Sequence, residues 1–593
     1  MRRLASLVLL AGLLAGTLLP LSAATAAALA PATSASAVRR APPDLPAVDP
    51  TYVYEQLAYM ATHFQRREAG YDTNLPVTQN GHDEFADYWQ AEMLRDLDGF
   101  GTVARRDPFT VQGWSGRPAK IPAFNVEVTV PGQTHPEQMV VIGCHYDGEA
   151  SSTQSANDDG SGCAIELAVA KAMADYWRAR HVYPARTLRF VIFDAEEQGV
   201  YGSFYYLNAT VNGDSANIVA MFNEEQNGIA YPLRFLGKAS NPVLPFYTML
   251  SPLQNNKLYP HQDQLSPARR DALTRFRALM AQAVPAVFAQ FQALGYTTLD
   301  YQDDAGSPVS LPIFTADDAS RQVQLQDDEI GSSDQIPFTL AGAPDATFIG
   351  NFTYYDSAPT PPPWSYPYDQ PQDTIQLMNT YASGQSSAAK ALQLSLALPG
   401  MLTTWMLSQP EVLGSVAPDG KPIAAISDVG PAMAGLPLTL DAAASFAPAG
   451  SGALSYAWDF GDGTRVSGQA VQHTYVNAGT YSLTLTVSGP GGARTVAKSL
   501  TVTPQAPVYI NPYARFQQSG VPPSNPLVTL PVPRDQPDAA VTPTVSGSRT
   551  SGSANSSRVN LGGVLLYTAL ALAALIVVAA LVLVLSRRRS KRE

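Results

Sequence analysis

Three short apolar runs, each ending in ionisable residues, constrain the fold of this chain more than any other feature. The runs are Met139–Cys144, Leu188–Phe193 and Ile218–Asn223. Apolar strands followed by polar residues are typical of an open α/β sheet, whose ligand site lies beyond the carboxyl ends of its strands. Between the first two runs, the apolar spacing over Gly162–Arg178 fits a helix. The pattern therefore predicts a layered α/β domain with a site at one edge of its sheet.

The composition changes along the 593 residues predict several segments. Short alternating strands with Gly-rich turns after the α/β region indicate a small all-β sandwich. Pro, Ser, Thr and Gly dominate the following stretch, which predicts a stalk that does not fold. We expect a signal peptide at 1–27, a flexible leader at 28–48, the α/β domain at 49–410, the β-sandwich at 421–503, the stalk at 504–558, a transmembrane helix at 561–585 and a basic tail at 586–593.

Both ends of the chain carry membrane signals. Arg2 and Arg3 precede the apolar run Leu4–Leu21 and a set of small residues, which is the order of a secretory signal peptide. An N-terminal anchor is the alternative. The uncharged stretch Leu561–Leu585 is long enough to cross a hydrocarbon core of about 30 Å, and a cluster of Arg and Lys follows it. We therefore expect a single-pass cell-membrane protein with extracellular folded domains.

Charge and cysteine content exclude two classes of protein. The net charge of −12 argues against nucleic-acid binding, which depends on clusters of Lys and Arg. Cys144 and Cys163 are the only cysteines, so a small disulfide-rich scaffold is excluded. The two could form one disulfide in an oxidising compartment or remain as buried thiols.

Candidate ligands follow the predicted strands. His145 ends the first run, and Asp147 is placed to hold the second ring nitrogen of that histidine. Asp158 precedes the predicted helix, where a carboxylate could bind metal or simply interact with the helix N-terminus. The adjacent Glu196 and Glu197 repel each other unless a cation is shared; one could bind metal while the other accepts a proton from water. A solvated acidic turn is the alternative for this pair.

The third run ends in Asn223-Glu224-Glu225. Because alternate residues of a strand share a face, Asn223 and Glu225 point one way and Glu224 points the other. One histidine with several carboxylates and no cysteine ligand suits zinc in a hydrolytic site. Two zinc ions sharing Asp158 would form a two-metal site.

These pieces, taken in order, resemble the M28 family of zinc peptidases, which includes secreted bacterial aminopeptidases. The resemblance covers roughly residues 50–400. It implies a mixed-sheet α/β/α zinc-exopeptidase domain that holds one or two Zn²⁺ ions. The matching motifs are His145-Tyr146-Asp147, Asn157-Asp158-Asp159-Gly160-Ser161-Gly162, Glu196-Glu197-Gln198-Gly199, Asn223-Glu224-Glu225-Gln226-Asn227-Gly228, Ser333-Asp334-Gln335 and Gln372-Asp373-Thr374.

The resemblance also implies a role for each residue. His145 and Glu225 would hold one zinc, Asp158 would bridge, and Glu197 would hold the second zinc. Glu196 would be the general base, and Asp147 would orient His145. Two departures stand out: the family has Asp where this chain has Glu225, and its Ser-Asp-His motif ends here in Gln335. The resemblance thus places Gln335, a weaker zinc donor than imidazole, at the remaining ligand position.

The β-sandwich segment resembles a PKD domain, an Ig-like module. The resemblance rests on Tyr456–Gly463, His473–Tyr475 and Gly479–Tyr481. Asp459 and Asp462 are expected to form a turn, with cation binding as the alternative. Such domains act as spacers or substrate-binding modules and supply no catalysis.

The sequence therefore predicts a zinc-dependent exopeptidase, foremost an aminopeptidase, that hydrolyses peptide bonds at the outer cell surface with metal-activated water. Its partners would be peptide or protein substrates and the membrane, through the single C-terminal helix. The oligomeric state is left open. The alternative is a catalytically impaired surface binding protein that keeps the peptidase fold, because Gln335 replaces an expected histidine ligand.

Overall fold

The computed structural model describes residues 44–504 apart from 71–79, 113–119, 208–216, 230–245, 303–305, 330–332, 351–368, 384–387, 428–429, 431 and 449–451. The expected signal peptide, most of the leader, nearly all of the stalk, the transmembrane segment at 561–585 and the basic tail lie outside these residues. Within the described ranges, no helix has both the length and the hydropathy needed to cross a bilayer.

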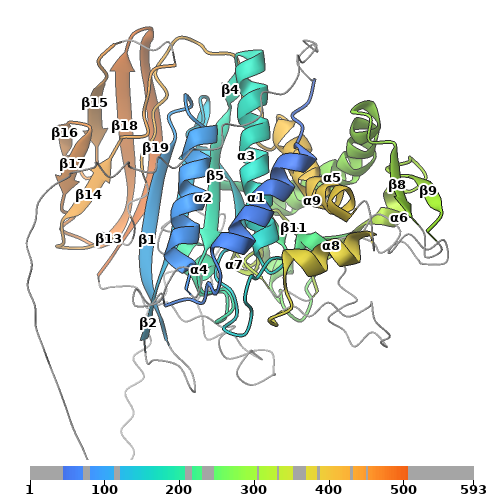
Figure 1. Cartoon of the computed structure of the whole chain (residues 1–593). Helices are drawn as coiled ribbons and strands as arrows, with labels where there is room; N and C mark the ends of the chain where they lie inside the picture. Colours follow the sequence, from blue (N-terminus) through green and yellow to red (C-terminus); the bar gives the residue numbers. More distant parts are fainter. Residues whose placement is uncertain are drawn as a thin grey trace, which may run out of the picture. The chain divides into compact units, whose positions relative to one another are not determined.

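An eight-stranded mixed sheet forms the centre of the first domain, in the order β1-β2-β5-β3-β6-β11-β7-β10 (Figure 1). The four central strands β5, β3, β6 and β11 are parallel, whereas β1 and β2 are antiparallel additions at one edge. At the other edge β7 runs antiparallel to β11, and β10 runs parallel to β7. The strands are β1 Val103–Gln112, β2 Lys120–Val130, β3 His135–His145, β5 Arg186–Phe193, β6 Ile218–Glu225, β7 Phe246–Leu250, β10 Val323–Asp327 and β11 Asp345–Ile349.

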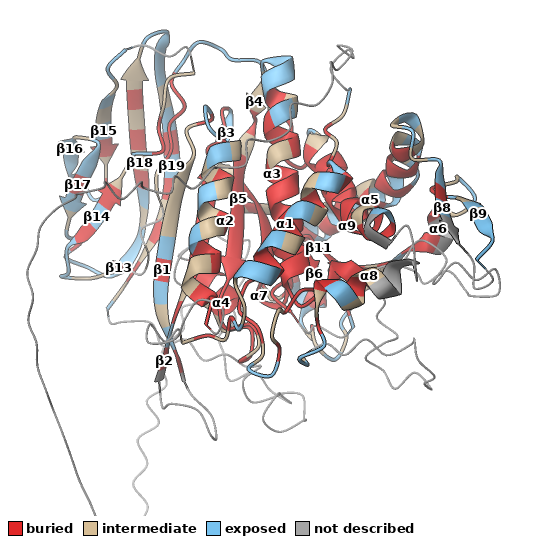
Figure 2. Cartoon of the chain, in the orientation of Figure 1, coloured by how far each residue is buried: buried red, intermediate tan, exposed pale blue. Residues whose placement is uncertain are grey.

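Helices cover both faces of this sheet, and side-chain alternation along the strands decides which residues meet them. Val140 and Ile142 of β3 join a large core with the long helices, whereas Met139 and Val141 pack against Phe338 of α7 on the other face. Figure 2 shows the buried residues concentrated in the strands and in the helix faces turned toward them. The long helices are α1 Pro50–His63, α2 His82–Asp96, α3 Gly160–Arg180, α5 Pro267–Ala293 and α9 Ala388–Ser408.

The remaining elements of this domain are short. They are α4 Tyr201–Tyr205, α6 Ala319–Gln322, α7 Ile336–Leu340, α8 Ile375–Ser383, the 3-10 helices η3 Asn227–Ile229 and η5 Gln262–Gln264, and the strands β4 Tyr183–Pro184, β8 Thr298–Gln302, β9 Pro308–Pro312 and β12 Ser415–Val416.

Helix α3 begins where its sequence supplies a cap and a close contact. The carboxylate of Asp159 accepts a hydrogen bond from the amide of Gly162, which satisfies one free N–H of the first turn. A Cβ atom at Gly162 would lie 2.2 Å from the main-chain oxygen of Glu224, so only glycine permits this approach of α3 to β6. The loop before α3 is thereby held against the carboxyl end of β6.

The second domain is a small β-sandwich. One sheet has the order β13-β19-β18-β15-β16, and β14 pairs with β17 in the other. Trp458 is buried in its core, and its indole N–H donates to the main-chain oxygen of Gly468. The mixed α/β domain and the small sandwich predicted from the sequence are both confirmed. The strands are β13 Ala432–Met433, β14 Leu438–Asp441, β15 Ser455–Asp459, β16 Arg465–Ser467, β17 Ala470–His473, β18 Gly479–Gly489 and β19 Gly492–Thr503.

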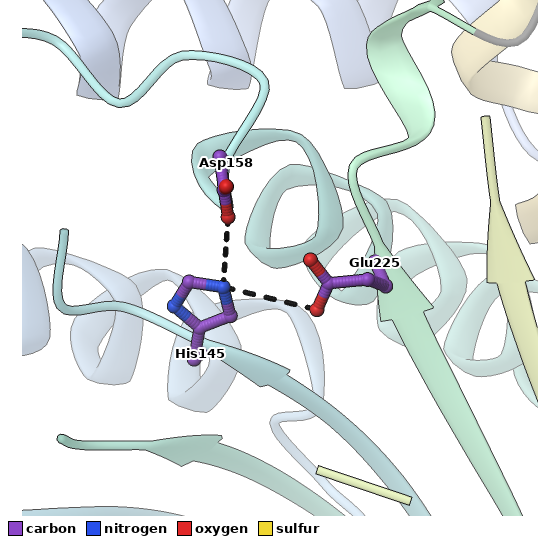
Figure 3. A group of neighbouring side chains, drawn as sticks. All are labelled: His145, Asp158 and Glu225. Atoms are coloured by element: carbon purple, nitrogen blue, oxygen red, sulfur yellow. Dashed lines mark hydrogen bonds and ion pairs between the residues drawn. The ribbon is translucent and has the colours of Figure 1, made fainter. Parts of the chain in front are cut away.

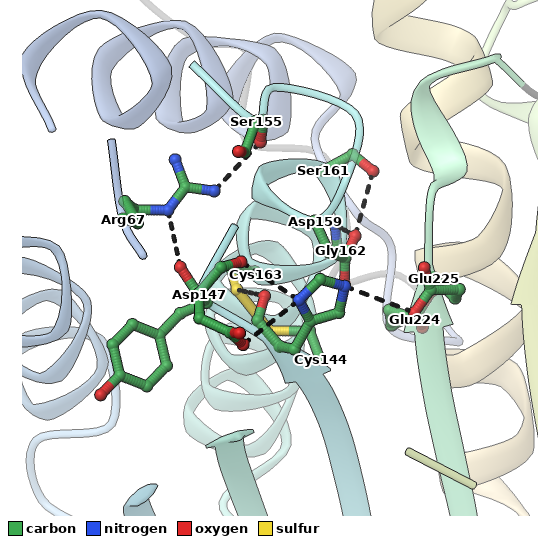
Figure 4. Close-up of a disulfide and its surroundings, with 12 residues drawn as sticks. Arg67, Cys144, Asp147, Ser155, Asp159, Ser161, Gly162, Cys163, Glu224 and Glu225 are labelled. Carbon is green, nitrogen blue, oxygen red and sulfur yellow. Dashed lines mark hydrogen bonds and ion pairs between the residues drawn. A yellow bond between two sulfur atoms is a disulfide. The ribbon is translucent and has the colours of Figure 1, made fainter. Parts of the chain in front are cut away.

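A disulfide between Cys144 and Cys163 joins the end of β3 to the first turn of α3 (Figure 4). Both residues are fully buried, and their Cα atoms are 5.6 Å apart. The structure thus favours the disulfide over the alternative of two thiols. The bond closes the loop that carries His145 and Asp158.

We predict that the double variant Cys144→Ala/Cys163→Ala unfolds more easily than the wild type. The cysteines are 19 residues apart, and closing a loop of this length stabilises a fold by about 3 kcal/mol. Denaturant unfolding under oxidising conditions, followed by tryptophan fluorescence, measures the difference. Reduced wild-type protein is the control and should resemble the variant. Coincident curves for the oxidised wild type and the variant would contradict the prediction.

Candidate metal centre

His145, Asp158 and Glu225 form a first group of possible metal ligands (Figure 3). His145 is the last residue of β3, Glu225 the last residue of β6, and Asp158 lies in the loop before α3. The imidazole Nε2 is 3.0 Å from Asp158 Oδ1 and 3.8 Å from Glu225 Oε2. One ligand atom from each residue lies within 4.8 Å of the others, and all three residues are buried. A single ion can therefore contact all three.

Asp158, Glu197 and Asp369 form a second group with the same spacing, and Asp158 is common to both. Glu197 lies in the turn after β5, where its Oε1 accepts a hydrogen bond from the amide of Glu149, 3.1 Å away. The two groups thus share one carboxylate, which is the arrangement of a two-metal site.

Asp369 was not among the residues identified from the sequence. Four residues later, the carboxylate of Asp373 accepts hydrogen bonds from the amides of Asn157 and Asp158, at 2.9 and 3.0 Å. The hydroxyl of Ser151 also donates to the main-chain oxygen of Asp369. These contacts fasten the segment to the loop before α3 and bring Asp369 to Asp158. The Gln372-Asp373-Thr374 motif is the one sequence signal that points to this region.

The expectation that Gln335 is a metal ligand stays a prediction, and its side chain hydrogen-bonds two neighbours. Its Oε1 accepts a hydrogen bond from Asn223, and its Nε2 donates to Asp328 at 3.0 Å. Its amide is therefore part of a buried polar network beside Glu225. In the same network the hydroxyl of Ser333 donates to Glu225 Oε2 at 2.5 Å.

Asp147 connects the histidine to the acidic turn. Its carboxylate accepts hydrogen bonds from the amides of Glu196 and Glu197, at 3.1 and 3.3 Å. The Nδ1 atom of His145 lies 3.2 Å from the main-chain oxygen of Asp147 and 3.5 Å from its carboxylate. One residue therefore fixes both the imidazole and the backbone that carries Glu196 and Glu197.

Glu224 and Glu225 point to opposite sides of β6. Glu225 belongs to the first group, whereas the carboxylate of Glu224 accepts hydrogen bonds from Thr403 of α9 at 2.8 Å and from Asn227 at 3.2 Å. Burial raises the pKa of Glu224 to about 8. Glu224 is thus a buried structural residue next to a candidate ligand.

The second group concentrates negative charge that protein contacts leave partly uncompensated. Burial, followed by the charge of Asp158, raises the pKa of Asp369 to about 9, and the same two effects raise the pKa of Glu197 well above its usual range. The Oδ1 atom of Asp369 is buried without a hydrogen-bond partner. A divalent cation would relieve both the repulsion and the missing contact. The first group combines an imidazole with two carboxylates, and this donor set fits zinc.

His82 and Asp194 form a buried ion pair next to the acidic turn. This pair was not identified from the sequence. The Nε2 of His82 lies 2.9 Å from Asp194 Oδ1, and its Nδ1 lies 2.9 Å from Asp83 Oδ1. Asp194 directly follows β5, two residues before Glu196, and its second carboxylate oxygen accepts a hydrogen bond from the amide of Phe124. Burial alone would lower the pKa of His82, but the carboxylates of Asp194 and Asp83 outweigh it and raise the pKa to about 9.

Stability should therefore fall as the pH rises through the range in which His82 loses its proton. Because its folded pKa lies above the ordinary value of 6.5, the ion pair stabilises the fold fully below pH 6.5 and loses this effect by about pH 9. The expected change is on the order of 3 kcal/mol. Unfolding midpoints measured across this range test it. His82→Gln should be less stable at pH 6 and lose the slope, whereas the exposed His63→Gln should keep it. An unchanged slope in His82→Gln would contradict the assignment.

The mixed parallel-centred sheet, with a histidine and carboxylates gathered beyond its central strands, defines a class of α/β metallohydrolase domains. Residues 125–304 match the model of peptidase family M28, and residues 419–504 match the model of the PKD domain. The chain therefore carries a domain of peptidase family M28 followed by a PKD domain.

The chain is also similar to parts of several individual proteins. The chain is 34% identical over 140 residues to a probable zinc metalloprotease of Pyricularia oryzae, covering 21% of this chain and 26% of that protein. It is 33% identical over 144 residues to human carboxypeptidase Q, covering 23% and 29%. The matched segments thus span less than a third of these relatives. A solved zinc aminopeptidase from Bacillus subtilis is 15% identical, with 62% of this chain and 96% of that chain covered and a TM-score of 0.38.

Proposed function

We propose that the α/β domain is a zinc-dependent exopeptidase that releases residues from the amino end of peptides. The observation that supports this most is the shared Asp158, which places a histidine-containing group and an acidic group side by side in a domain of peptidase family M28. Zinc appears in the names of two proteins similar to this chain. His145, Asp158 and Glu225 would hold it. Bound there, zinc would polarise the scissile carbonyl group and increase the acidity of the attacking water.

Glu196 is the proposed general base. Its amide is held by Asp147, whose carbonyl and carboxylate also contact His145, so the base and the zinc-binding histidine are positioned by one residue. Burial raises the pKa of the Glu196 carboxyl well above its usual range, and a cation nearby would lower it again. Ionised, Glu196 would take a proton from the attacking water and deliver it to the nitrogen of the leaving group.

Substitution of Glu196 by Gln should reduce kcat by about 10²- to 10⁴-fold, because the amide cannot accept that proton. Metal content should not change, since Glu196 belongs to neither ligand group. Steady-state kinetics and elemental analysis on the same preparation measure both quantities.

Glu224→Gln is a matched control for this experiment. It makes the same chemical change in a buried glutamate that faces Thr403 of α9, and Gln resembles the protonated carboxyl expected there at neutral pH. The control should keep wild-type kcat. Turnover by Glu196→Gln equal to that of Glu224→Gln would remove Glu196 as the base.

Two features favour action at the amino end of the substrate. Glu149 belongs to neither ligand group and adds a carboxylate beside Asp369 and Glu197, and this charge attracts the α-ammonium group of a peptide and repels an α-carboxylate. The nearby guanidinium of Arg67 is bonded to the main-chain oxygens of residues 146, 154 and 155. Arg67 is thereby held in the scaffold and is not turned toward a substrate carboxylate.

Peptides blocked at one end test this preference. A peptide with a free amino end and an amidated carboxyl end should be cleaved, whereas the N-acetylated peptide with a free carboxyl end should lose at least about tenfold in kcat/KM. Mass spectrometry of the products identifies the released residue. Cleavage of only the N-acetylated peptide would contradict aminopeptidase action and indicate a carboxypeptidase.

We further infer that the domain acts at the outer cell surface. The signal-like residues 1–27 and the apolar segment 561–585 support this location, and the PKD domain would serve as a spacer or a substrate-binding module. Surface protease digestion of intact cells tests it, because a cytoplasmic domain would be protected. The second candidate function, a catalytically impaired binding protein, would be favoured if the purified chain contained no zinc and cleaved neither blocked nor free peptides.

A further inference from the structure

We propose that the two ligand groups take different metals: zinc in the group of His145, and a hard, oxygen-preferring divalent cation of the Mn²⁺ type in the group of Asp158, Glu197 and Asp369. The proposal rests on the proposed function for the first group and adds the chemistry of the second. It makes the centre a mixed-metal site that shares Asp158.

The donor atoms of the two groups differ. The first group offers one imidazole nitrogen together with carboxylate oxygens, whereas the second offers carboxylate oxygens alone. Imidazole suits zinc, and sets of carboxylate, carbonyl and water oxygens suit Mg²⁺, Ca²⁺ and Mn²⁺. Asp158 belongs to both groups, so the difference between them comes from His145 in the first and from Glu197 and Asp369 in the second.

The chain has no further imidazole or thiolate to complete the second group. All seven histidines lie in the described residues, and His145 is the only one that belongs to either group. Both cysteines form the disulfide. Gln335 donates its amide N–H to Asp328, so the only donor atom that it could offer a metal is its amide oxygen, Oε1. Any added ligand at the second position is therefore an oxygen atom or water.

The position of Asp369 indicates that a cation completes the second group. Its Oδ1 is buried without a partner, although Ser151 and Asp373 fasten its segment beside Asp158. Asp158 is itself 5% exposed. Glu197 and Asp369 are partly buried, and one oxygen from each of the three carboxylates lies within 4.8 Å of the others, which is costly unless a positive charge lies between them.

Zinc binds most protein sites more tightly than Mn²⁺ does. The two groups should therefore differ in how strongly each prefers zinc when zinc and Mn²⁺ compete for both. Without a nitrogen donor, the second group loses much of the advantage that zinc holds over Mn²⁺. An excess of Mn²⁺ should then fill the second group while the first keeps zinc.

The test uses the full-length protein, stripped with a chelator and supplied with two equivalents of zinc and a large excess of Mn²⁺. Elemental analysis after desalting should give one zinc and one manganese per chain, and the electron paramagnetic resonance spectrum should show bound Mn²⁺. Two zinc ions and no manganese per chain would overturn the proposal. One zinc and no second ion would overturn it as well, while leaving the zinc of the proposed function in place. No zinc at all would instead contradict the proposed function.

Asp369→His supplies the missing imidazole. Its apparent affinity for zinc in the second group should rise by about tenfold or more, and manganese should be displaced under the same competition. Asp271→His, which adds an imidazole at an exposed position of α5, is the matched control and should bind metals as the wild type does. Circular dichroism checks that both variants fold. If Asp369→His misfolds, the wild-type competition alone decides; if it folds and keeps its manganese, the proposal is wrong.

Discussion

The crowding of carboxylates beyond the central strands is the constraint on which the rest of this structure depends. Asp158 and Glu225 are buried, Glu197 and Asp369 are partly buried, and like charges brought this close repel one another. Such an arrangement persists only if the backbone holds it rigidly and a cation offsets the charge. The loops, the caps and the disulfide around the centre are best understood as the means of holding it.

That rigidity is supplied from several parts of the chain at once. Asp147 and Asp373 use their carboxylates to bind main-chain amides, the first in the acidic turn and the second in the loop before α3. The disulfide closes the same loop, and Gly162 allows α3 to approach β6. Several acidic residues near the centre are therefore structural, and only a few are candidate ligands.

Much of the α/β domain could be predicted from the sequence, because the patterns that indicate its strands and its long helix each lie within a few neighbouring residues. Apolar runs that end in polar residues indicate buried strands with a site at their ends, and alternation along β6 separates Glu224 from Glu225. The expected helix over Gly162–Arg178 is observed as α3, two residues longer at each end; the Asp159 cap sets its start at Gly160, and His181 caps its end. Neither prediction requires knowledge of distant contacts.

What the sequence by itself determined was therefore the class of domain, the strand ends that carry His145, Glu197 and Glu225, and the presence of a second, all-β domain. Only the tertiary structure decided that Asp369 lies with Asp158 and Glu197. The reason is physical: Asp369 is 211 residues from Asp158 in sequence (369 − 158), and long-range hydrogen bonds from the amides of Asn157 and Asp158 to the carboxylate of Asp373 bring the two together. No local pattern encodes such a contact, whereas strand alternation and capping are encoded within a few residues.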